Sequence, residues 1–371
     1  MTDVPLQEHP ASPAPKPRRP WLAVVLVTMI LIAVAGIATW WFALGRENAP
    51  DWTRASRLDL AAPAGDAFLA GTPWVRLGLA PLVPGQNNTI EASLEASNGT
   101  PVPETGAPAL FLTTQPLAGE PVTAEPLMLS PDGTASATLD RAGWWRITAE
   151  IAKDEASSPA EFYLLLPDPN INGAGAPPRF ESSDDGATLF RRGSEAIARL
   201  QTVRYRQWMA DGKGNAAVSD HAVRAGGNGQ PPGFIYRAAG GMEAVVIGAT
   251  RWVRFPDSPT WQEQQGAIVV PPAEWVEEYS GATGFTILGE ETVDGEVCQL
   301  LAFYLPELTE PQTRSAAWYL WWVGTETGHV RREAMVSRQH FMLNHFTDFD
   351  APLDIQPPPP AGTPLAATPV P

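Results

Sequence analysis

The sequence predicts a mainly β protein, anchored to a membrane by one helix, whose second domain combines a helix with strands (α+β). Three observations predict this fold class. An unbroken apolar run occupies 21–45, short alternating apolar segments fill 72–167, and one helical segment followed by many strands fills 180–356. We therefore expect one N-terminal span followed by two β-rich domains.

The apolar run Trp21–Gly45 is the predicted transmembrane helix, because its 25 residues include no ionisable side chain. At ~1.5 Å per residue it would extend about 37 Å, enough to cross a hydrocarbon layer about 30 Å thick. Three cations precede it: Lys16, Arg18 and Arg19. This bias places the disordered, Pro-rich tail at 1–20 in the cytoplasm and everything after the span outside the cytoplasmic membrane.

A cleaved signal peptide is the alternative interpretation of this run. Ala33-Val34-Ala35 has the small-x-small form that signal peptidase prefers. The apolar run continues past that point with Trp40 and Trp41, which favours an uncleaved single-pass anchor. Both interpretations export the rest of the chain to the cell envelope.

Charge and cysteine content limit the function classes. The chain carries a net charge of −16 and its first 45 residues carry +1, so the remaining 326 carry −17. An acidic surface repels nucleic acid, so we expect no nucleic-acid partner. Cys298 is the single cysteine, which excludes an internal disulfide and leaves core burial as the source of stability.

The first exported domain is expected at 72–167, after a linker at 46–71. Seven alternating segments predict its strands: Trp74–Leu79, Thr89–Ala96, Ala109–Thr113, Val122–Leu129, Thr134–Leu139, Trp144–Ile151 and Glu161–Leu166. Turn residues such as Asn98-Gly99 and Asp132-Gly133 separate them. Seven short strands at this spacing predict an immunoglobulin-like β-sandwich.

Two stretches of this domain, PGQNNTIEASLEASNGTPV and DGTASATLDRAGWWRITAEI, resemble the YtkA-like domain, a small exported sandwich associated with copper-resistance proteins of the CopC and CopD type. The resemblance implies an extracytoplasmic domain linked to copper handling or the assembly of redox proteins. The copper ligands do not carry over, because 72–167 contains no His and no Cys and only Met128 as a soft ligand.

A linker rich in Pro, Gly and Asn at 168–179 precedes the second domain, expected at 180–356. Ser182 and Ser183 offer N-caps for a helix that continues to Leu200. Ten strands are predicted after it: Val203–Met209, Val218–Arg224, Phe234–Ala238, Glu243–Ile247, Arg251–Arg254, Phe285–Glu290, Val297–Tyr304, Ala317–Val323, Val330–Arg338 and His340–Phe349. A short helix is expected at Pro271–Tyr279, and a Pro-rich disordered tail at 357–371.

The second domain resembles the LolA and LppX type of lipoprotein-carrier and lipid-binding folds. The likeness lies in VRYRQWMADG, GGMEAVVIGATRWVRFPDSPTW, ETVDGEVCQLLAFYLP and the long segment from AWYLWWVG to DAPLDI. It implies an unclosed half-barrel of antiparallel strands with a hydrophobic cavity beneath helices. The family binds acyl chains or signals through a partner.

Aromatic residues of the second domain are the candidate lining of an apolar pocket: Trp208, Trp252, Trp275, Trp318, Tyr236 and Phe303. The alternative is that these side chains fill a solid core. The strand around Trp318-Tyr319-Leu320-Trp321-Trp322 is too apolar for one wet face, so both of its faces are expected to be covered.

A His/Met cluster is the candidate metal site: Met335, His340, Met342 and His345. In an extended strand His340 and Met342 share a face and His345 projects from the other. Cu(I) is the cofactor that such soft ligands would select. The alternative is that the methionines pack in the apolar layer and the histidines lie at its margin.

Motifs of catalysis are absent from the sequence, which contains neither Gly-x-Ser-x-Gly nor His-Glu-x-x-His, so we expect no enzyme. The leading hypothesis is a membrane-anchored extracytoplasmic binding protein that presents or senses a lipid or other apolar ligand. A copper-handling accessory protein and a structural module that contacts envelope proteins are the alternatives.

Overall fold

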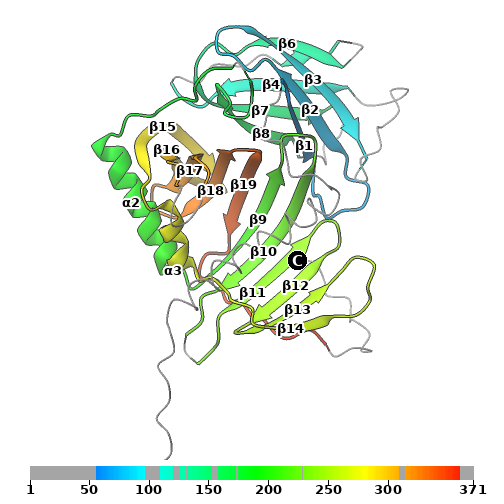
Figure 1. Ribbon diagram of the computed structural model, residues 1–371, viewed down its shortest axis with the longest axis vertical. Coiled ribbons are helices and arrows are strands. Elements are labelled where there is room, and N and C mark those ends of the chain that lie inside the picture. The colour runs from blue at the N-terminus through cyan, green and yellow to red at the C-terminus, as the bar shows by residue number, and fades with distance from the viewer. Residues whose placement is uncertain are drawn as a thin grey trace, which may run out of the picture. The chain divides into compact units, whose positions relative to one another are not determined.

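The computed structural model describes residues 56–96, 109–119, 126–130, 133–152, 158–172, 174–227, 229–308 and 314–359. Strands predominate in this part of the chain, in antiparallel sheets that include one large open sheet (Figure 1). The prediction of a mainly β protein is confirmed. No helix among the described residues is long and apolar enough to cross a bilayer. The predicted anchor Trp21–Gly45 lies outside them and stays a prediction.

Eight of the described strands form two four-stranded sheets. They are β1 (Leu58–Pro63), β2 (Trp74–Ala80), β3 (Asn87–Glu95), β4 (Leu110–Pro116), β5 (Leu127–Met128), β6 (Thr134–Thr138), β7 (Gly143–Ile151) and β8 (Ala160–Leu166). One sheet has the order β1-β2-β3-β6 and the other β5-β4-β7-β8. Their alternating apolar side chains, Leu77 and Ile90 from one sheet and Ile147 and Phe162 from the other, are fully buried in one core.

Strand β1 is a short ordered segment within the linker expected at 46–71. Leu58–Pro63 pairs antiparallel with β2 and adds an edge strand to the first sheet. Leu58 and Leu60 are buried, because the alternation of LDL places both leucines on the face that packs against the core. The strand expected at Val122–Leu129 is shorter in its described part, where it covers Leu127–Met128.

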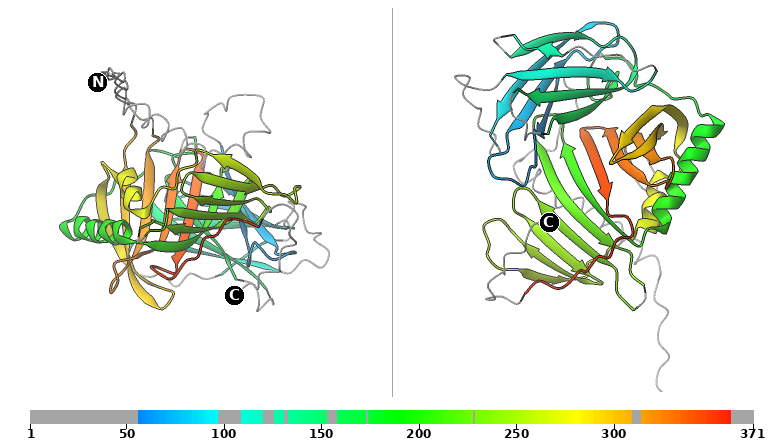
Figure 2. Two further views of the ribbon diagram at one scale, coloured as in Figure 1. Left: turned by 90° about the horizontal axis from the view of Figure 1, so that it is seen from below. Right: turned by 180° about the vertical axis from the view of Figure 1, so that it is seen from behind.

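Eleven of the described strands form the large sheet. They are β9 (Thr202–Ala210), β10 (Ala216–Arg224), β11 (Gly233–Ala238), β12 (Glu243–Ile247), β13 (Thr250–Arg254), β14 (Gln262–Gln265), β15 (Thr283–Val293), β16 (Glu296–Leu305), β17 (Ala317–Gly324), β18 (Val330–Ser337) and β19 (His340–Thr347). The order is β14-β13-β12-β11-β10-β9-β19-β18-β17-β16-β15. Two meanders therefore meet where β19 pairs with β9, and β14 and β15 are the open edges (Figures 1 and 2).

Three short helical segments cover one face of this sheet near β15–β18. Helix α2 (Asp184–Arg199) begins at Ser183, whose Oγ accepts a hydrogen bond of 3.0 Å from the amide of Gly186. Helix α3 (Pro272–Trp275) continues directly into the 3-10 turn η1 (Val276–Tyr279). The helix expected at Pro271–Tyr279 is therefore present as these two short pieces.

Strand β17 shows how the sheet divides its side chains between two faces. Tyr319 and Trp321 pack with Leu189 of α2, on what we call the helix face. Trp318 and Trp322 belong instead to the core shared with the four-stranded sheets, on what we call the sandwich face. Every residue of β17 is buried, which confirms the expectation that both faces of this strand are covered.

Contacts on the sandwich face join the four-stranded sheets to the large sheet. The indole N–H of Trp208 donates to the carbonyl oxygen of Ala61 in β1 at 2.8 Å. Glu291 of β15 pairs with Arg146 of β7 and also accepts a 3.0 Å hydrogen bond from Trp322. Both regions belong to one compact unit, Trp52–Pro371. The division into two separate domains at 168–179 stays a prediction.

The connecting segment after β8 is held by polar contacts. The amide of Asn170 donates to the Oδ1 of Asp168 at 2.7 Å, and the side chain of Asn170 bridges the β18–β19 turn through Ser337 and Gln339. Asp168 is completely buried, and its Oδ2 has no hydrogen-bond partner among the described residues. Burial raises the pKa of the Asp168 carboxyl to about 7.

Candidate functional site

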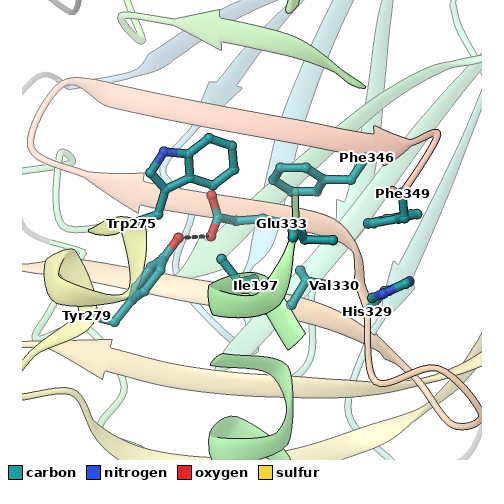
Figure 3. Close-up of a pocket in the computed structure, with 9 residues that line it drawn as sticks. Ile197, Trp275, Tyr279, His329, Val330, Glu333, Phe346 and Phe349 are labelled. Carbon is teal, nitrogen blue, oxygen red and sulfur yellow. Dashed lines mark hydrogen bonds between the residues drawn. The ribbon is translucent and has the colours of Figure 1, made fainter. Parts of the chain in front are cut away.

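An enclosed cavity lies on the helix face, between α2, the α3–η1 segment and the large sheet (Figure 3). Its lining residues are Ile197, Leu200, Trp275, Tyr279, His329, Val330, Glu333, Phe346 and Phe349. The cavity has a volume of about 20 Å³ that is accessible to the centre of a water molecule, so it has room for roughly one water molecule. Aromatic side chains, among them that of the predicted pocket residue Trp275, therefore occupy most of the space at this position.

An open groove lies on the other side of Tyr279. It offers about 680 Å³ between α2 and η1 and is lined by Phe190, Ser194, Val276, Glu277, Tyr279, Ser280, Gly281 and Ala282. This volume lies in the usual range of ligand pockets, roughly 300–1,000 Å³. Tyr279 lines both spaces, so the groove and the enclosed cavity approach each other at this residue.

A hydrogen bond holds Tyr279 in this position. Its hydroxyl donates to the Oε2 of Glu333 at 2.6 Å (Figure 3). Glu333 lies on β18 and is 3% exposed. It also accepts hydrogen bonds from the indole N–H of Trp321 at 2.7 Å and the side-chain amide of Asn344 at 3.0 Å. Burial raises the pKa of Glu333, although these three donors oppose the shift.

Glu333 begins a row of polar side chains across the helix face. The pairing register places Glu333, Asn344, Gln207 and Ser219 side by side on β18, β19, β9 and β10. The side-chain amide of Gln207 donates to Asn344 at 3.0 Å, which extends the hydrogen bonds from Glu333 to a third strand. Polar groups that are buried in an apolar face must be paired with each other, so this row fixes where the strands meet.

His221 lies beside the end of this row. Its Nε2 and the hydroxyl of Ser219 are 2.8 Å apart, while its Nδ1 is buried without a hydrogen-bond partner among the described residues. The imidazole stacks on Tyr205, with ring centroids 4.3 Å apart. Burial lowers the pKa of His221 to about 3, so the ring is neutral at pH 7.

The helical segments that cover the cavity, α2 and α3–η1, differ in length, capping and burial. Helix α2 has 16 residues, a side-chain N-cap and five buried residues. Segments α3 and η1 have four residues each and no side-chain N-cap, and η1 buries no residue. The side chains of Trp275 and Tyr279 provide the main contacts of α3–η1 with the rest of the site. Short segments without a side-chain N-cap open at lower cost than a long capped helix, so we infer that α3–η1 is the part of the cover that moves first.

The six predicted pocket residues are distributed over both faces of the sheet. Trp275 lines the enclosed cavity, and Phe303 is fully buried on the helix face, where it stacks on Tyr319. Tyr236 also lies on the helix face, 5.2 Å from the ring of His221. The other three, Trp208, Trp318 and Trp252, point away from that face.

Trp208 and Trp318 are instead buried in the core shared with the four-stranded sheets. Trp252 lies towards the outer edge of the large sheet, where its indole N–H contacts Glu263. The side chains of Trp208, Trp252 and Trp318 therefore contribute to packing and edge contacts away from the enclosed cavity.

The predicted metal ligands also divide between the faces. Met335 and Met342 are cross-strand neighbours on the helix face, and His340 shares the face of Met342. His345 lies on the sandwich face, where its Nε2 pairs with the Oδ2 of Asp294 at 2.6 Å. Among the described residues, no three His, Cys, Asp or Glu side chains come together as a metal site.

Sequence reasoning did not identify Met209, Tyr279 or Glu333 as candidate residues. Met209 pairs with Met342 across β9 and β19, so three methionines line up on adjacent strands. Glu333 follows two arginines in VRREAM, a charged run that is typical of a solvated strand. Glu333 could have been identified from its spacing, because it lies two residues before Met335 and both side chains of a strand at this spacing point to one face.

No protein-family model matches the sequence, and no curated protein matches it. Among solved structures, the chain is similar to the lipoprotein LppX of Mycobacterium tuberculosis and to LprF of Mycobacterium bovis. For LppX the identity is 17% and the TM-score 0.36, with 47% of this chain and 100% of LppX covered. For LprF the identity is 16% and the TM-score 0.37, with 49% of this chain and 100% of LprF covered.

A LolA superfamily protein of Nitrosomonas europaea is also similar, at 12% identity and a TM-score of 0.21, over 47% of this chain and 94% of that protein. LppX and this LolA superfamily protein are of the type expected for the second domain from its sequence.

Proposed function

We propose that the protein binds an elongated apolar ligand beneath its helical cover and acts by binding rather than by catalysis. The observation that carries this proposal is the position of Tyr279, which lines both an open groove of about 680 Å³ and the enclosed aromatic cavity. The ligand first occupies the groove against Phe190 and Ala282. Movement of α3–η1 then joins the groove to the space beside Trp275.

The energetics of this opening are moderate. Opening breaks the hydrogen bond between Tyr279 and Glu333, and hydrogen bonds to charged groups contribute about 1.5–3 kcal/mol. Each ligand methylene that leaves water contributes roughly 0.8 kcal/mol in return. Burial of about four methylenes offsets this hydrogen bond, and further methylenes are needed to offset the contacts of the Tyr279 ring with Tyr319 and Trp321. A longer alkyl chain therefore favours the open state while a short solute does not.

The predicted anchor Trp21–Gly45 would hold this site at the outer surface of the cytoplasmic membrane. A tethered binding domain presents or senses its ligand instead of carrying it across the envelope. The pairing of β3 with β2 and β6, and of β4 with β5 and β7, supports the proposal that the first domain is immunoglobulin-like. In this arrangement β1 is an additional edge strand.

Binding of N-phenyl-1-naphthylamine, an apolar dye whose fluorescence rises in apolar sites, tests this function. The full chain would be used in amphipol, with amphipol alone as the blank. Ser280→Trp places an indole in the groove and is expected to weaken binding at least tenfold. Glu274→Trp, at an exposed position of α3 outside both linings, is the matched control. Absence of dye binding, or equal binding by both variants, contradicts the proposal.

Copper handling is the second candidate function, and the alignment of Met209, Met342 and Met335 favours it. Thioethers on adjacent strands, with His340 nearby, suit Cu(I). The Sδ of Met342 already accepts a contact of 3.3 Å from Gln207, which metal binding would have to break. Titration of the full chain with Cu(I) tests this candidate, and a dissociation constant in the millimolar range or weaker would exclude it.

A further inference from the structure

Glu333 is the acidic member of the cavity lining, at the point where the ligand of the proposed function would meet the sheet. We propose that Glu333 selects ligands whose polar end is a hydrogen-bond donor, as in a long-chain alcohol or amine, over ligands that end in a carboxylate. This inference rests on the proposed function and names the class of ligand for the same site.

The three donors to Glu333 come from two different kinds of element. Trp321 and Asn344 lie on β17 and β19 and donate from fixed positions in the sheet. Tyr279 donates from η1, the segment whose movement opens the cavity. Opening therefore removes one donor and leaves a buried carboxylate oxygen without its shortest hydrogen bond. The Oε2 atom then keeps only the donor from Trp321, and the loss of one hydrogen bond to a buried carboxyl oxygen is costly, so a ligand that supplies a hydroxyl or an ammonium group replaces the donor that Tyr279 withdraws.

Among the described residues that line the cavity, none is a Lys or Arg that could pair with a ligand carboxylate. His329 is the basic member of the lining, and burial together with the nearby Arg331 lowers its pKa, so it is neutral at pH 7. Arg331 itself is committed to Glu296, with Nη2 and Oε2 2.7 Å apart, and lies over the ring of Phe349. A ligand carboxylate beside Glu333 would therefore share a buried site with a second carboxyl group, and two carboxyl groups this close cannot both ionise without a large cost.

Three ligands with one chain length test this selection: 1-dodecanol, dodecylamine and dodecanoate. Each would displace N-phenyl-1-naphthylamine from the full chain in amphipol at pH 7.5, and the blank would correct for partition into the amphipol. We expect the two donors to bind about tenfold or more tighter than dodecanoate, the ratio that one hydrogen bond to a charged group provides.

Variants assign the selection to Glu333. Glu333→Gln keeps the side-chain shape but adds an N–H donor, so we expect it to lose the preference for the donors and to bind dodecanoate more tightly. Glu290→Gln makes the same change at an exposed position of β15 and is the control. Tyr279→Phe removes the competing hydroxyl, so dodecanol should bind more tightly while the order of the ligands is kept.

The possible results separate this inference from the proposed function. If the dye binds and all three ligands displace it equally, or if dodecanoate is preferred, the selection by Glu333 is wrong and apolar binding stands. The same holds if Glu333→Gln leaves the ratio unchanged while its thermal unfolding matches that of Glu290→Gln. If neither the dye nor any ligand binds, the proposed function itself fails.

Discussion

Replacement of Tyr279 by phenylalanine isolates the hydrogen bond that closes the cavity. The ring contacts should persist, because the ring of Tyr279 lies 4.8 Å from that of Trp321 and 5.4 Å from that of Tyr319, and neither contact uses the hydroxyl. The loss is then confined to one hydrogen bond to Glu333, which keeps its other two donors. We expect the closed state to lose about 2 kcal/mol, or about thirtyfold in the opening equilibrium.

Native-state hydrogen exchange measures this opening directly. The amides of Ser280 and Ala282, which donate to Glu277 and Tyr279, should exchange about thirtyfold faster in Tyr279→Phe. Amides of β17 should be unaffected. Tyr304→Phe, on the sandwich face, is the control and should leave Ser280 and Ala282 unchanged. Unchanged exchange at these amides in Tyr279→Phe, or equal acceleration in β17, would refute the view that this bond holds a local gate.

Three further predictions concern pH and the contacts between the sheets. The pKa of Asp168 is raised to about 7, so its contribution to stability is lost as pH rises from about 4 through 7; Asp168→Asn should be more stable than the parent in urea at pH 8, with a smaller difference at pH 5, and an equal difference at both would contradict this. The pKa of His221 is lowered to about 3, so stability is lost as pH falls below about 6.5; His221→Phe should show a flatter decline between pH 6.5 and 4.5 in the same assay, and a parallel decline would count against it. Trp208→Phe removes the donor to Ala61 and should cost roughly 1 kcal/mol; exchange in β1 should rise more than exchange in β10, and a uniform rise would show a different role for the indole.

Local patterns predicted the strands well because alternation of apolar residues survives in almost every one of them. Strand β14, QEQQ, was not predicted because it has no apolar residue and pairs at an exposed edge of the sheet. Strand β1 was not predicted because the segment LDLAAP is short and lies close to the predicted membrane segment. Both misses involve edge strands, where packing imposes the weakest pattern on the sequence.

The candidate site was harder to predict because it depends on register. Trp318 and Trp321 look equivalent in the sequence, yet one packs against the four-stranded sheets and the other contacts Glu333. The meeting of Tyr279 with Glu333 joins residues 54 positions apart, and no local pattern reports such a contact. Composition and spacing identified the aromatic residues of the second domain. The pairing of β17, β18 and β19 determines which of their side chains face the helices.

The row from Glu333 through Asn344 to Gln207 also constrains how this sheet can assemble. A slip of β19 by one residue would turn Asn344 towards the opposite face and remove the donor that Asn344 provides to the Oε1 of Glu333. The sheet closes its two meanders at that same seam, between β19 and β9. The hydrogen bond from Asn344 to Glu333 therefore favours the native register of β19 over a register shifted by one residue. The residue proposed to select the ligand thus also contributes to the correct assembly of the sheet.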